Sequence, residues 1–579
     1  LETVMRLTDG NPLFVTELLG VAPGQVPSSI RDLILGKAAD LDSEARDLLK
    51  GLSVVPEPVA VAVAEQLAPR AEEGLERCTR RGLLEVRGHR VKFRHELIRR
   101  AVEEGLATAE RESANSRMLE LLRDDTDPAR LAHHAIQAGD VEAILRFVPR
   151  AAASAAAVGS HREAVRHYAA LEPYLGRFEP DARGEILDAW GTEAAVGLRR
   201  TRRGQHRGED LRVQQMRVAH HHELANSAAE SAALADAAYA LYEVSSLAEA
   251  KACAARALEV LGPGPDGSDH LPAFEVLAVL PMMVGDAEAT LHWADRAMGA
   301  AGPDTDDALL ISILISRASI IDAHHYPQGQ AENCALAERA ADAGIWHQAC
   351  RAFYNNAESA AQAFDLKAAM DFLERSIAAA QREDLPGWEA RAMVVAGMVH
   401  FHAGDWDRAE DVAHEVMAVS PIYEPALAFL GAIEARQGRP AARNTVHEGW
   451  RHAWRGAEPQ YTVPAAAVLA EYAWITGEEV DVAIGDLVAV LEKGLELFPS
   501  YERTGSLALW LWKLGELEAA PAGIAEPYRL MIEGEPLAAA RMWESYRFPY
   551  EQAIALSSGD PAAQLESLEI LETLGATAV

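Results

Sequence analysis

The chain repeats a helical unit about every 38 residues over most of its length, a spacing typical of helical repeat proteins. Most units begin at a short turn and continue into an alanine-rich helix, as in GDAEATLHWADRAM after Gly285 and GDWDRAEDVAHEVM after Gly404. Further units begin near Leu247, Pro327, Asp365, Gly438, Gly477 and Gly515. Since such repeats bury a core only by stacking on their neighbours, the pattern predicts a solenoid whose concave wall is a binding surface.

Composition agrees with an all-α fold. The chain has 579 residues, too many for one hydrophobic core. It is 49% hydrophobic but only 6% aromatic, and alanine, the best helix former, dominates. The net charge of −34 keeps a large helical protein in solution and repels nucleic acid and anionic membrane over most of the surface. No apolar run is long enough to cross a bilayer.

The first residues, LETVMRLTDGNPLFVTELLG, predict two helices joined by a tight turn at residues 9–12. Pro12 suits the first position of the second helix, because its missing N–H would be unpaired there. Helical stretches fill most of residues 29–81, and polar and apolar residues then alternate about Gly88. This alternation predicts a two-stranded hairpin. The apolar members of the pattern are Leu84, Val86, Val91 and Phe93. Helices followed by one hairpin are typical of a winged helix.

The sequence contains no pattern of a catalytic or metal site. GxxxxGK[ST], GxSxG and HExxH do not occur. The cysteines have no ligand spacing and are expected to be reduced, partly buried thiols: Cys78, Cys253, Cys334 and Cys350. Neighbouring histidines on a helix point about 100° apart, so the three histidine clusters are not expected to chelate a metal. These clusters are His133–His134, His220–His222 and His324–His325.

Basic residues gather around the predicted hairpin. They are Arg77, Arg80, Arg81, Arg87, Arg90, Lys92, Arg94, Arg99 and Arg100. Three interpretations stay open: contact with DNA, docking on a nucleotide-binding domain with its phosphates, or an ordinary solvated face. A second basic run spans residues 199–217. It is best explained by arginines that end a helix at a repeat turn, with partner docking as an alternative.

The tryptophans fall at helical spacings within the repeats. They are Trp293, Trp346, Trp388, Trp406, Trp474, Trp510, Trp512 and Trp543. Large rings fill the gaps between stacked helix pairs, so packing is favoured over a ligand cage. An effector on the concave face would be lined by a subset of them.

Several stretches resemble one family closely: GNPLFVTELL, VPSSIRDLIL, VKFRHELIRRAVEE and DPARLAHHAIQAGD. In this order they resemble the large ATP-binding transcriptional regulators of the LuxR type, which belong to the signal-transduction ATPases with numerous domains. The likeness covers essentially the whole chain. It implies the end of an ATPase nucleotide-binding module over residues 1–25, a winged helix over 26–112 and a tetratricopeptide-like sensor over 113–579. The family's phosphate loop, its Mg-binding acid and its C-terminal helix-turn-helix are missing, so a fragment of a longer regulator is expected.

The resemblance also implies site residues. Gly10 and Pro12 match the family's GxP motif, in which the proline packs on the adenine of the nucleotide. His95 matches the winged-helix histidine that contacts the β-phosphate and holds the closed state. ATP or ADP is therefore expected in the intact protein, which would be a slow ATPase, with no tight binding and no catalysis by this fragment.

The expected function is that of a cytoplasmic sensor and regulatory region. A protein or small-molecule inducer would bind the repeats and shift the nucleotide state, and the activated protein would self-associate. DNA would be bound only through the missing C-terminal domain, and no membrane is involved. Two alternatives remain at this stage: the control module of an adenylate or guanylate cyclase, and a stand-alone repeat scaffold for protein binding.

Overall fold

A computed structural model describes most of the chain. The described residues are 28–68, 70–123, 127–197, 207–244, 247–322, 326–383, 385–419, 424–456, 458–478, 480 and 482–579. The structure divides between Ile186 and Leu187 into two compact units, called unit 1 and unit 2, which are described separately. The predicted end of an ATPase module over residues 1–25 lies outside the described residues. Within them, no helix is long and apolar enough to span a membrane.

Unit 1 begins with a small module of helices and a sheet, called the hairpin module. Its elements are α3 (Ser28–Ala39), α4 (Ser43–Ser53), β1 (Val59–Ala60), α5 (Val61–Ala64), α6 (Ala71–Arg80), β2 (Leu84–Arg87), β3 (Arg90–Phe93) and α7 (Glu96–Glu104). β2 and β3 pair antiparallel, with Val86 opposite Val91, around Gly88 at φ +58°. The predicted hairpin is confirmed. β1 adds a third strand on the other side of β3, which the sequence pattern did not predict.

The rest of unit 1 is helical. It comprises α8 (Thr108–Leu121), α9 (Pro128–Ala138), α10 (Val141–Ala157), α11 (His161–Leu171), the 3-10 helix η1 (Glu172–Arg177) and the start of α12 (Pro180–Gly197). The predicted domain boundary after residue 112 falls inside α8. Unit 1 therefore contains both the hairpin module and the first helix pairs, and the division into three domains stays a prediction.

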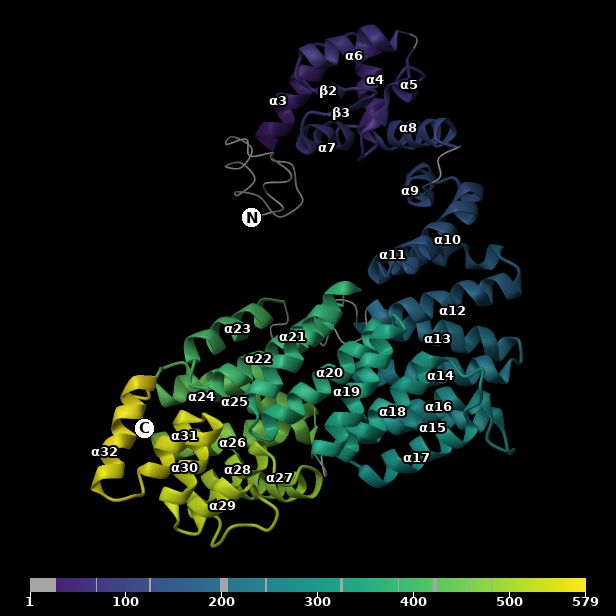
Figure 1. The fold of residues 1–579 in the computed structure, drawn as a ribbon. Helices are drawn as coiled ribbons and strands as arrows, with labels where there is room; N and C mark the ends of the chain where they lie inside the picture. The colour runs from purple at the N-terminus through teal and green to yellow at the C-terminus, as the bar shows by residue number, and fades with distance from the viewer. Residues whose placement is uncertain are drawn as a thin grey trace. The chain divides into compact units, whose positions relative to one another are not determined.

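Unit 2 is an array of helices, shown stacked side by side in Figure 1. After α12 its elements are α13 (Arg207–Glu223), α14 (Ser227–Val244), α15 (Leu247–Leu261), η2 (Ser268–His270), α16 (Leu271–Met283), α17 (Ala287–Ala300), α18 (Asp307–Asp322), α19 (Tyr326–Asp342), α20 (Trp346–Gln362), α21 (Leu366–Arg382), α22 (Pro386–His402), α23 (Trp406–Val419), α24 (Glu424–Arg436), α25 (Ala442–Gly456), α26 (Pro459–Thr476), α27 (Ile484–Leu497), α28 (Glu502–Lys513), α29 (Glu526–Ile532), α30 (Pro536–Tyr546), α31 (Pro549–Leu556) and α32 (Pro561–Leu574). The predicted all-α fold with helical repeats is confirmed.

The turns between helices explain the repeat pattern. At Gly404 the backbone is left-handed (φ +81°), and the N–H groups of Gly404 and Asp405 donate to carbonyls of the preceding helix. The same turn ends α16 at Gly285 (φ +77°), and the Asp286 side chain then caps α17. Left-handed turns of this kind favour glycine and stop one helix cleanly, while aspartate starts the next. At some other turns a residue other than glycine takes the left-handed position, among them Ala225 (φ +51°), Phe364 (φ +68°) and Arg547 (φ +64°).

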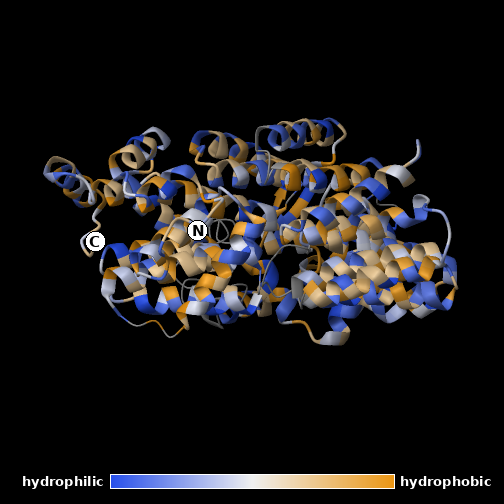
Figure 2. Ribbon diagram, turned by 90° about the horizontal axis from the view of Figure 1, so that it is seen from below, coloured by the Kyte–Doolittle hydropathy of each residue, from blue (hydrophilic) through white to orange (hydrophobic). Residues whose placement is uncertain are grey.

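Alternate helices of unit 2 form an inner row, namely α14, α16, α18, α20, α22, α24, α26 and α28. Each contacts the next member of the row as well as its sequence neighbours. Inner helices are buried on most sides, as in the run Ala465–Ala467 of α26, whereas outer helices bury one stripe. Figure 2 shows apolar and polar residues interleaved along these helices. The inner row provides the wall on which the candidate site is built.

The last residues of the chain return to the middle of the array. The Ala578 N–H donates to the carbonyl of Arg436 (3.0 Å), and the Thr577 hydroxyl donates to the carbonyl of Gln437 (3.0 Å). Near the same place, a Cβ on Gly404 would lie 2.7 Å from Leu574, so α32 packs closely on the turn after α22. Helices far apart in sequence therefore meet around α22 and α24.

Candidate functional site

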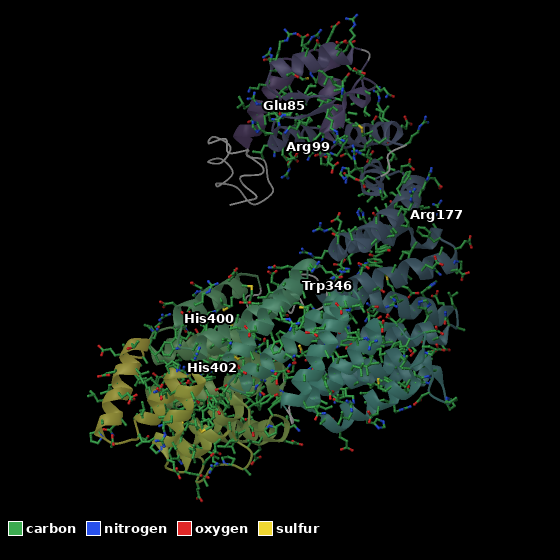
Figure 3. The ribbon with its side chains drawn as sticks, viewed as in Figure 1. Glu85, Arg99, Arg177, Trp346, His400 and His402 are labelled. Carbon is green, nitrogen blue, oxygen red and sulfur yellow. The ribbon has the colours of Figure 1, made fainter. Side chains whose placement is uncertain are left out.

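The inner helices of unit 2 enclose a cavity of about 110 Å³, called the inner cavity. Its apolar lining comes mainly from α22, α24 and α26: Val394, Val395, Met398, Phe401, Phe429, Pro464, Ala467 and Val468. Its polar lining includes Gln362, His402, Arg436, Glu471, Glu502, Arg503 and Glu551. Concave, mostly apolar cavities with a few converging polar groups are the usual form of a ligand site. Figure 3 labels His402, which lies within unit 2 at the end of α22.

Helix ends position the charged groups of this cavity. Gln362, His402 and Arg436 are the last residues of α20, α22 and α24, each two residues before a left-handed turn residue. Glu502 opens α28, and Glu551 lies in the first turn of α31. Arg436 at a C-terminal end and Glu502 and Glu551 at N-terminal ends match the helix dipoles, whereas Arg503 in the first turn of α28 does not.

Arg436 forms the main ion pair of the cavity. Its Nε lies 2.8 Å from Glu471 Oε1, and its Nη2 lies 3.1 Å from Glu471 Oε2. The Tyr550 hydroxyl donates to Glu471 (2.6 Å), and its ring centroid lies 3.5 Å from the Arg436 guanidinium carbon. Burial alone would lower the pKa of Arg436, but the Glu471 carboxylate outweighs it and raises that pKa. Arg436 therefore carries its charge while 4% exposed.

His402 lies between two carboxyl groups without bonding to either. Its Nε2 is 3.9 Å from Glu502 Oε2, and its Nδ1 is 4.0 Å from Glu551 Oε1, both too long for hydrogen bonds. Burial, helped by the Arg436 charge, lowers the pKa of His402 to about 3. Burial also raises the pKa of Glu551 to about 7. At neutral pH the cavity thus holds a neutral imidazole beside a carboxyl group that is partly protonated.

Three buried polar atoms of this cluster have no hydrogen-bond partner in the described structure: Arg436 Nη1, His402 Nδ1 and Glu551 Oε2. Their residues are between 4% and 7% exposed. A buried donor or acceptor left without a partner costs roughly 1–3 kcal/mol, so native proteins rarely leave several together. Their grouping around one cavity makes it the candidate ligand site of unit 2.

A second cavity, of about 130 Å³, continues the same inner surface. It shares with the inner cavity the following lining residues: Tyr354, Glu358, Gln460, Tyr461 and Arg503. Arg503 lies on this shared wall, where its Nε donates to Gln362 (2.9 Å) and its Nη2 donates to Glu358 (3.0 Å). Of the predicted tryptophans, Trp388 lines this second cavity. The inner surface of unit 2 is therefore hollow over several helices.

The structure places His95 in a separate cavity of about 250 Å³ in the hairpin module. His95 is the N-cap residue of α7, and Lys92, Arg94 and Arg99 line the same cavity. Glu57 and Glu96 also line it, and Arg99 pairs with Glu96 (2.6 Å), so the bases of this cavity are partly neutralised. The other predicted nucleotide residues, Gly10 and Pro12, lie outside the described residues. The shared role of these three residues stays a prediction.

The basic residues of the hairpin module are largely matched by acids from neighbouring turns. Arg81 pairs with Asp40 (3.0 Å), and Arg87 pairs with Glu85 (2.6 Å). Such pairs weaken the positive field that the sequence suggested, and they favour the interpretation of an ordinary solvated face. Among the described residues, no three metal-ligating side chains come together.

The second basic run also differs from its interpretation as helix-ending arginines. Arg217 lies inside α13, 6% exposed, and bonds to Asp188 (3.0 Å) and Asp236 (2.8 Å). For this residue the interpretation is wrong, because two aspartates from neighbouring helices hold it in the interior. Residues 198–206 of the run lie outside the described residues.

Sequence reasoning missed the inner cavity altogether. One signal was present: the positions two before the turn residues at 364, 404 and 438 hold Gln362, His402 and Arg436. A polar residue at the same register of three successive repeats indicates an inner wall with a shared purpose. Their partners from α26, α28 and α31 lie 35–149 residues further along the chain, and no local pattern connects them.

Comparison with known proteins leaves the chain without a family assignment. No family model matches it, and no curated protein matches it. One similar solved structure is a signal transduction ATPase with numerous domains, with a tetratricopeptide repeat sensor, from Pyrococcus horikoshii. It has 18% identity and a TM-score of 0.33, over 81% of this chain and 70% of that chain. A circular tandem repeat protein with novel repeat topology has 16% identity and a TM-score of 0.12, over 94% of this chain and 96% of that one. At these values neither likeness carries an argument, so the fold rests on the helices described above.

Proposed function

We propose that this chain is the sensor and regulatory region of an ATP-dependent transcriptional regulator of the LuxR type. The observation that carries the proposal is the inner cavity, a partly apolar chamber with unbonded buried polar atoms inside a helical repeat array. A scaffold that only displays its outer or concave surface to proteins has no need of such a chamber. The role of the chain is therefore binding of an inducer, and catalysis is not assigned to it.

The hairpin module supports the second half of the proposal, the coupling to nucleotide. Its elements follow the order two helices, strand, two helices, hairpin and helix, which suits the winged helix of that family. His95 stands beside Lys92 and Arg94 at a cavity, where an imidazole can donate a hydrogen bond to phosphate. ATP or ADP would be bound in the intact protein by a domain that this chain only borders, with Gly10 and Pro12 against the adenine.

The mechanism is a shift between two states. In the resting state the winged helix holds ADP in a closed form, partly through His95. An inducer in unit 2 favours the open form, in which ATP replaces ADP, and self-association follows. The inducer shifts this equilibrium only by the difference between its affinities for the two forms. DNA is then bound by a domain outside this chain.

A test of the nucleotide role is His95→Ala in the intact regulator. We expect weaker retention of ADP and a higher basal output, measured by nucleotide release after purification and by a reporter gene. His89→Ala is the matched control, because His89 is an exposed histidine of the same hairpin. If ADP retention and basal output are unchanged in His95→Ala, the assignment of His95 is wrong.

A further inference from the structure

We infer that the inner cavity binds a small amphoteric molecule of the amino-acid type: one amino group, one carboxylate and a short apolar body. The inference rests on the proposed function, because it names the chemical class of the inducer. It is carried by the unbonded atoms of Arg436, His402 and Glu551 and by the size of the cavity that they line.

The first argument is the balance of charge. Arg436 pairs with Glu471, and Arg503 pairs with Glu358. Among the described lining residues, Glu502 and Glu551 then form no ion pair with an arginine or lysine, and the neutral His402 stands between them. Glu502 accepts one hydrogen bond, from the Tyr528 hydroxyl (2.9 Å). A ligand that brings an ammonium group supplies the missing cation to these two carboxyl groups.

The second argument is the donor that remains. Arg436 uses Nε and Nη2 on Glu471, which leaves Nη1 without an acceptor. A guanidinium N–H is a strong donor that suits a carboxylate oxygen. His402 Nδ1 lies beside it in the same lining and can donate or accept according to its tautomer. The cavity therefore offers an acceptor for an ammonium group and a donor for a carboxylate within one chamber.

The third argument is size and lining. A water-sized molecule needs roughly 10–15 Å³ of such free volume, so about 110 Å³ accommodates a ligand of roughly ten non-hydrogen atoms. An apolar amino acid has this size, whereas a peptide helix does not fit. The wall opposite the charges is made by aliphatic and aromatic side chains of α22, α24 and α26: Val394, Val395, Met398, Phe429, Ala467 and Val468. These side chains suit a short hydrocarbon body.

Selectivity follows from the same contacts. An amine without a carboxylate leaves Arg436 Nη1 unbonded, and an acid without an amine places a second anion beside Glu502 and Glu551. Each incomplete ligand therefore leaves a buried charged group without its partner, a penalty that favours the amphoteric molecule.

The experiment is calorimetric titration of the full 579-residue chain with three probes of one carbon skeleton: L-leucine, isopentylamine and 4-methylpentanoate. The shift in melting temperature is also measured with L-valine, L-isoleucine, L-methionine and L-phenylalanine, whose side chains are similar in size to that of leucine. We expect at least one of the five amino acids to bind, and the amine and acid counterparts of leucine to bind at least about tenfold more weakly than leucine. Absence of binding by all five amino acids overturns the inference, as does equal binding of isopentylamine and leucine.

Two variants test the residues. Glu551→Gln keeps the shape and removes the ionisable carboxyl group, so we expect affinity for the binding amino acid to fall about tenfold or more. Arg436→Lys keeps the positive charge and removes the planar guanidinium with its several N–H donors. We expect this variant to bind L-leucine and isopentylamine with similar affinity. Glu566→Gln, an exposed glutamate of α32, is the matched control and should bind as the unaltered chain does. Unchanged affinity in a folded Glu551→Gln protein overturns the assignment.

The outcome separates this inference from the proposed function. If the chain binds an amino acid but the intact protein keeps its ADP retention and reporter output unaltered, the proposed function fails and the inference stands. If His95→Ala raises basal output but no amino acid binds the chain, the inference fails and the proposed function stands.

Discussion

Two buried arginines, one in each unit, are bonded in different ways. In unit 1, Arg99 is 7% exposed and bonds to Glu96, to Glu103 and to the carbonyl of Ser53. In unit 2, Arg436 is 4% exposed and leaves one guanidinium nitrogen unbonded. Both arginines form ion pairs. Every buried side-chain nitrogen of Arg99 has a hydrogen-bond partner, whereas Nη1 of Arg436 has none. The difference is the observation on which the proposed ligand site in unit 2 rests.

Two buried histidines repeat the contrast. Burial lowers the pKa of His134 and of His402 to about 3, so both are neutral at physiological pH. His134 Nδ1 lies 2.8 Å from the Asn115 side-chain oxygen, and Asn115 is itself fully buried. His402 Nδ1 has no such partner. Burial and a shifted pKa are therefore common to structural and binding residues, and satisfied hydrogen bonding is what separates them.

The largest expected effect comes from removing the two arginines. Arg436→Ala leaves the Glu471 charge buried without a cation, which should lower the free energy of unfolding of unit 2 by about 3–5 kcal/mol. Arg99→Ala leaves the Ser53 carbonyl unbonded beside two part-exposed glutamates, so unit 1 should lose only about 1–3 kcal/mol. All eleven tryptophans lie in unit 2, from Trp190 onward. Urea titrations followed by tryptophan fluorescence thus report unit 2 alone, while far-UV circular dichroism reports both units.

An equal loss in the two variants would remove the contrast between the units. Arg529→Ala is the control for arginine truncation itself, because Arg529 makes only exposed pairs on α29. It should change stability by less than about 1 kcal/mol.

A second, somewhat smaller effect concerns pH. Glu551 has a pKa of about 7 in the folded chain against an ordinary 4.5, so the folded state holds its proton over a range in which the unfolded state has released it. Its contribution to stability is present below pH 4.5 and is lost as pH rises to about 7, a change of about 3 kcal/mol. Glu551→Gln should remove this loss. The stability of the variant relative to the unaltered chain should therefore rise between pH 4.5 and 7.

Other titratable and charged groups lie near Glu551, so the pH dependence of the variant must be compared with that of the unaltered chain. His402 acts with the opposite sign, because its lowered pKa costs stability as pH falls below 6.5. Arg436, Glu471 and Glu502 also face the group. These contributions are shared by both proteins and largely cancel in the difference, measured by fluorescence in urea at each pH. If the difference in free energy of unfolding between the two proteins does not change from pH 4.5 to 7, the raised pKa of Glu551 is contradicted.

The smallest effect is expected from the histidines. His134→Phe leaves the Asn115 oxygen unbonded in the interior and should cost unit 1 about 1–3 kcal/mol. His402→Phe removes an imidazole nitrogen that has no partner, so it should cost unit 2 less than about 1 kcal/mol while abolishing ligand binding. Circular dichroism checks the first and fluorescence the second. A larger loss for His402→Phe than for His134→Phe would show that His402 serves the fold.

Much of the architecture could be predicted from local pattern. Glycine–aspartate turns and alanine-rich helices indicated the array, and alternation around Gly88 indicated the hairpin, because both signals lie within a few residues. The two-residue strand Val59–Ala60 was missed, since it is too short to show any alternation. The turn at Phe364 has no glycine, and its side chain is instead held against Trp543, Tyr546 and Phe548.

The candidate site could not be predicted in the same way. His95 was identified by resemblance, and the structure adds the cavity around it, which is lined by both bases and acids. The inner cavity depends on α31 lying beside α22 and α24, a contact between segments more than 100 residues apart. The contact of α31 with α22 and α24 depends on the path of the helical array. That path is set by the packing angles between many successive helices and by no single motif.

The hydrogen bond between the Ala578 N–H and the Arg436 carbonyl has a mechanical consequence. In a repeat array, each repeat contacts only its neighbours, so a force applied at one end unfolds the terminal helices first. Here Thr577 and Ala578 are hydrogen-bonded to residues at the end of α24. A force applied at the C-terminal residue therefore acts directly on α24, in the middle of the array. The residue that carries this load through its backbone is the one whose side chain lies in the inner cavity.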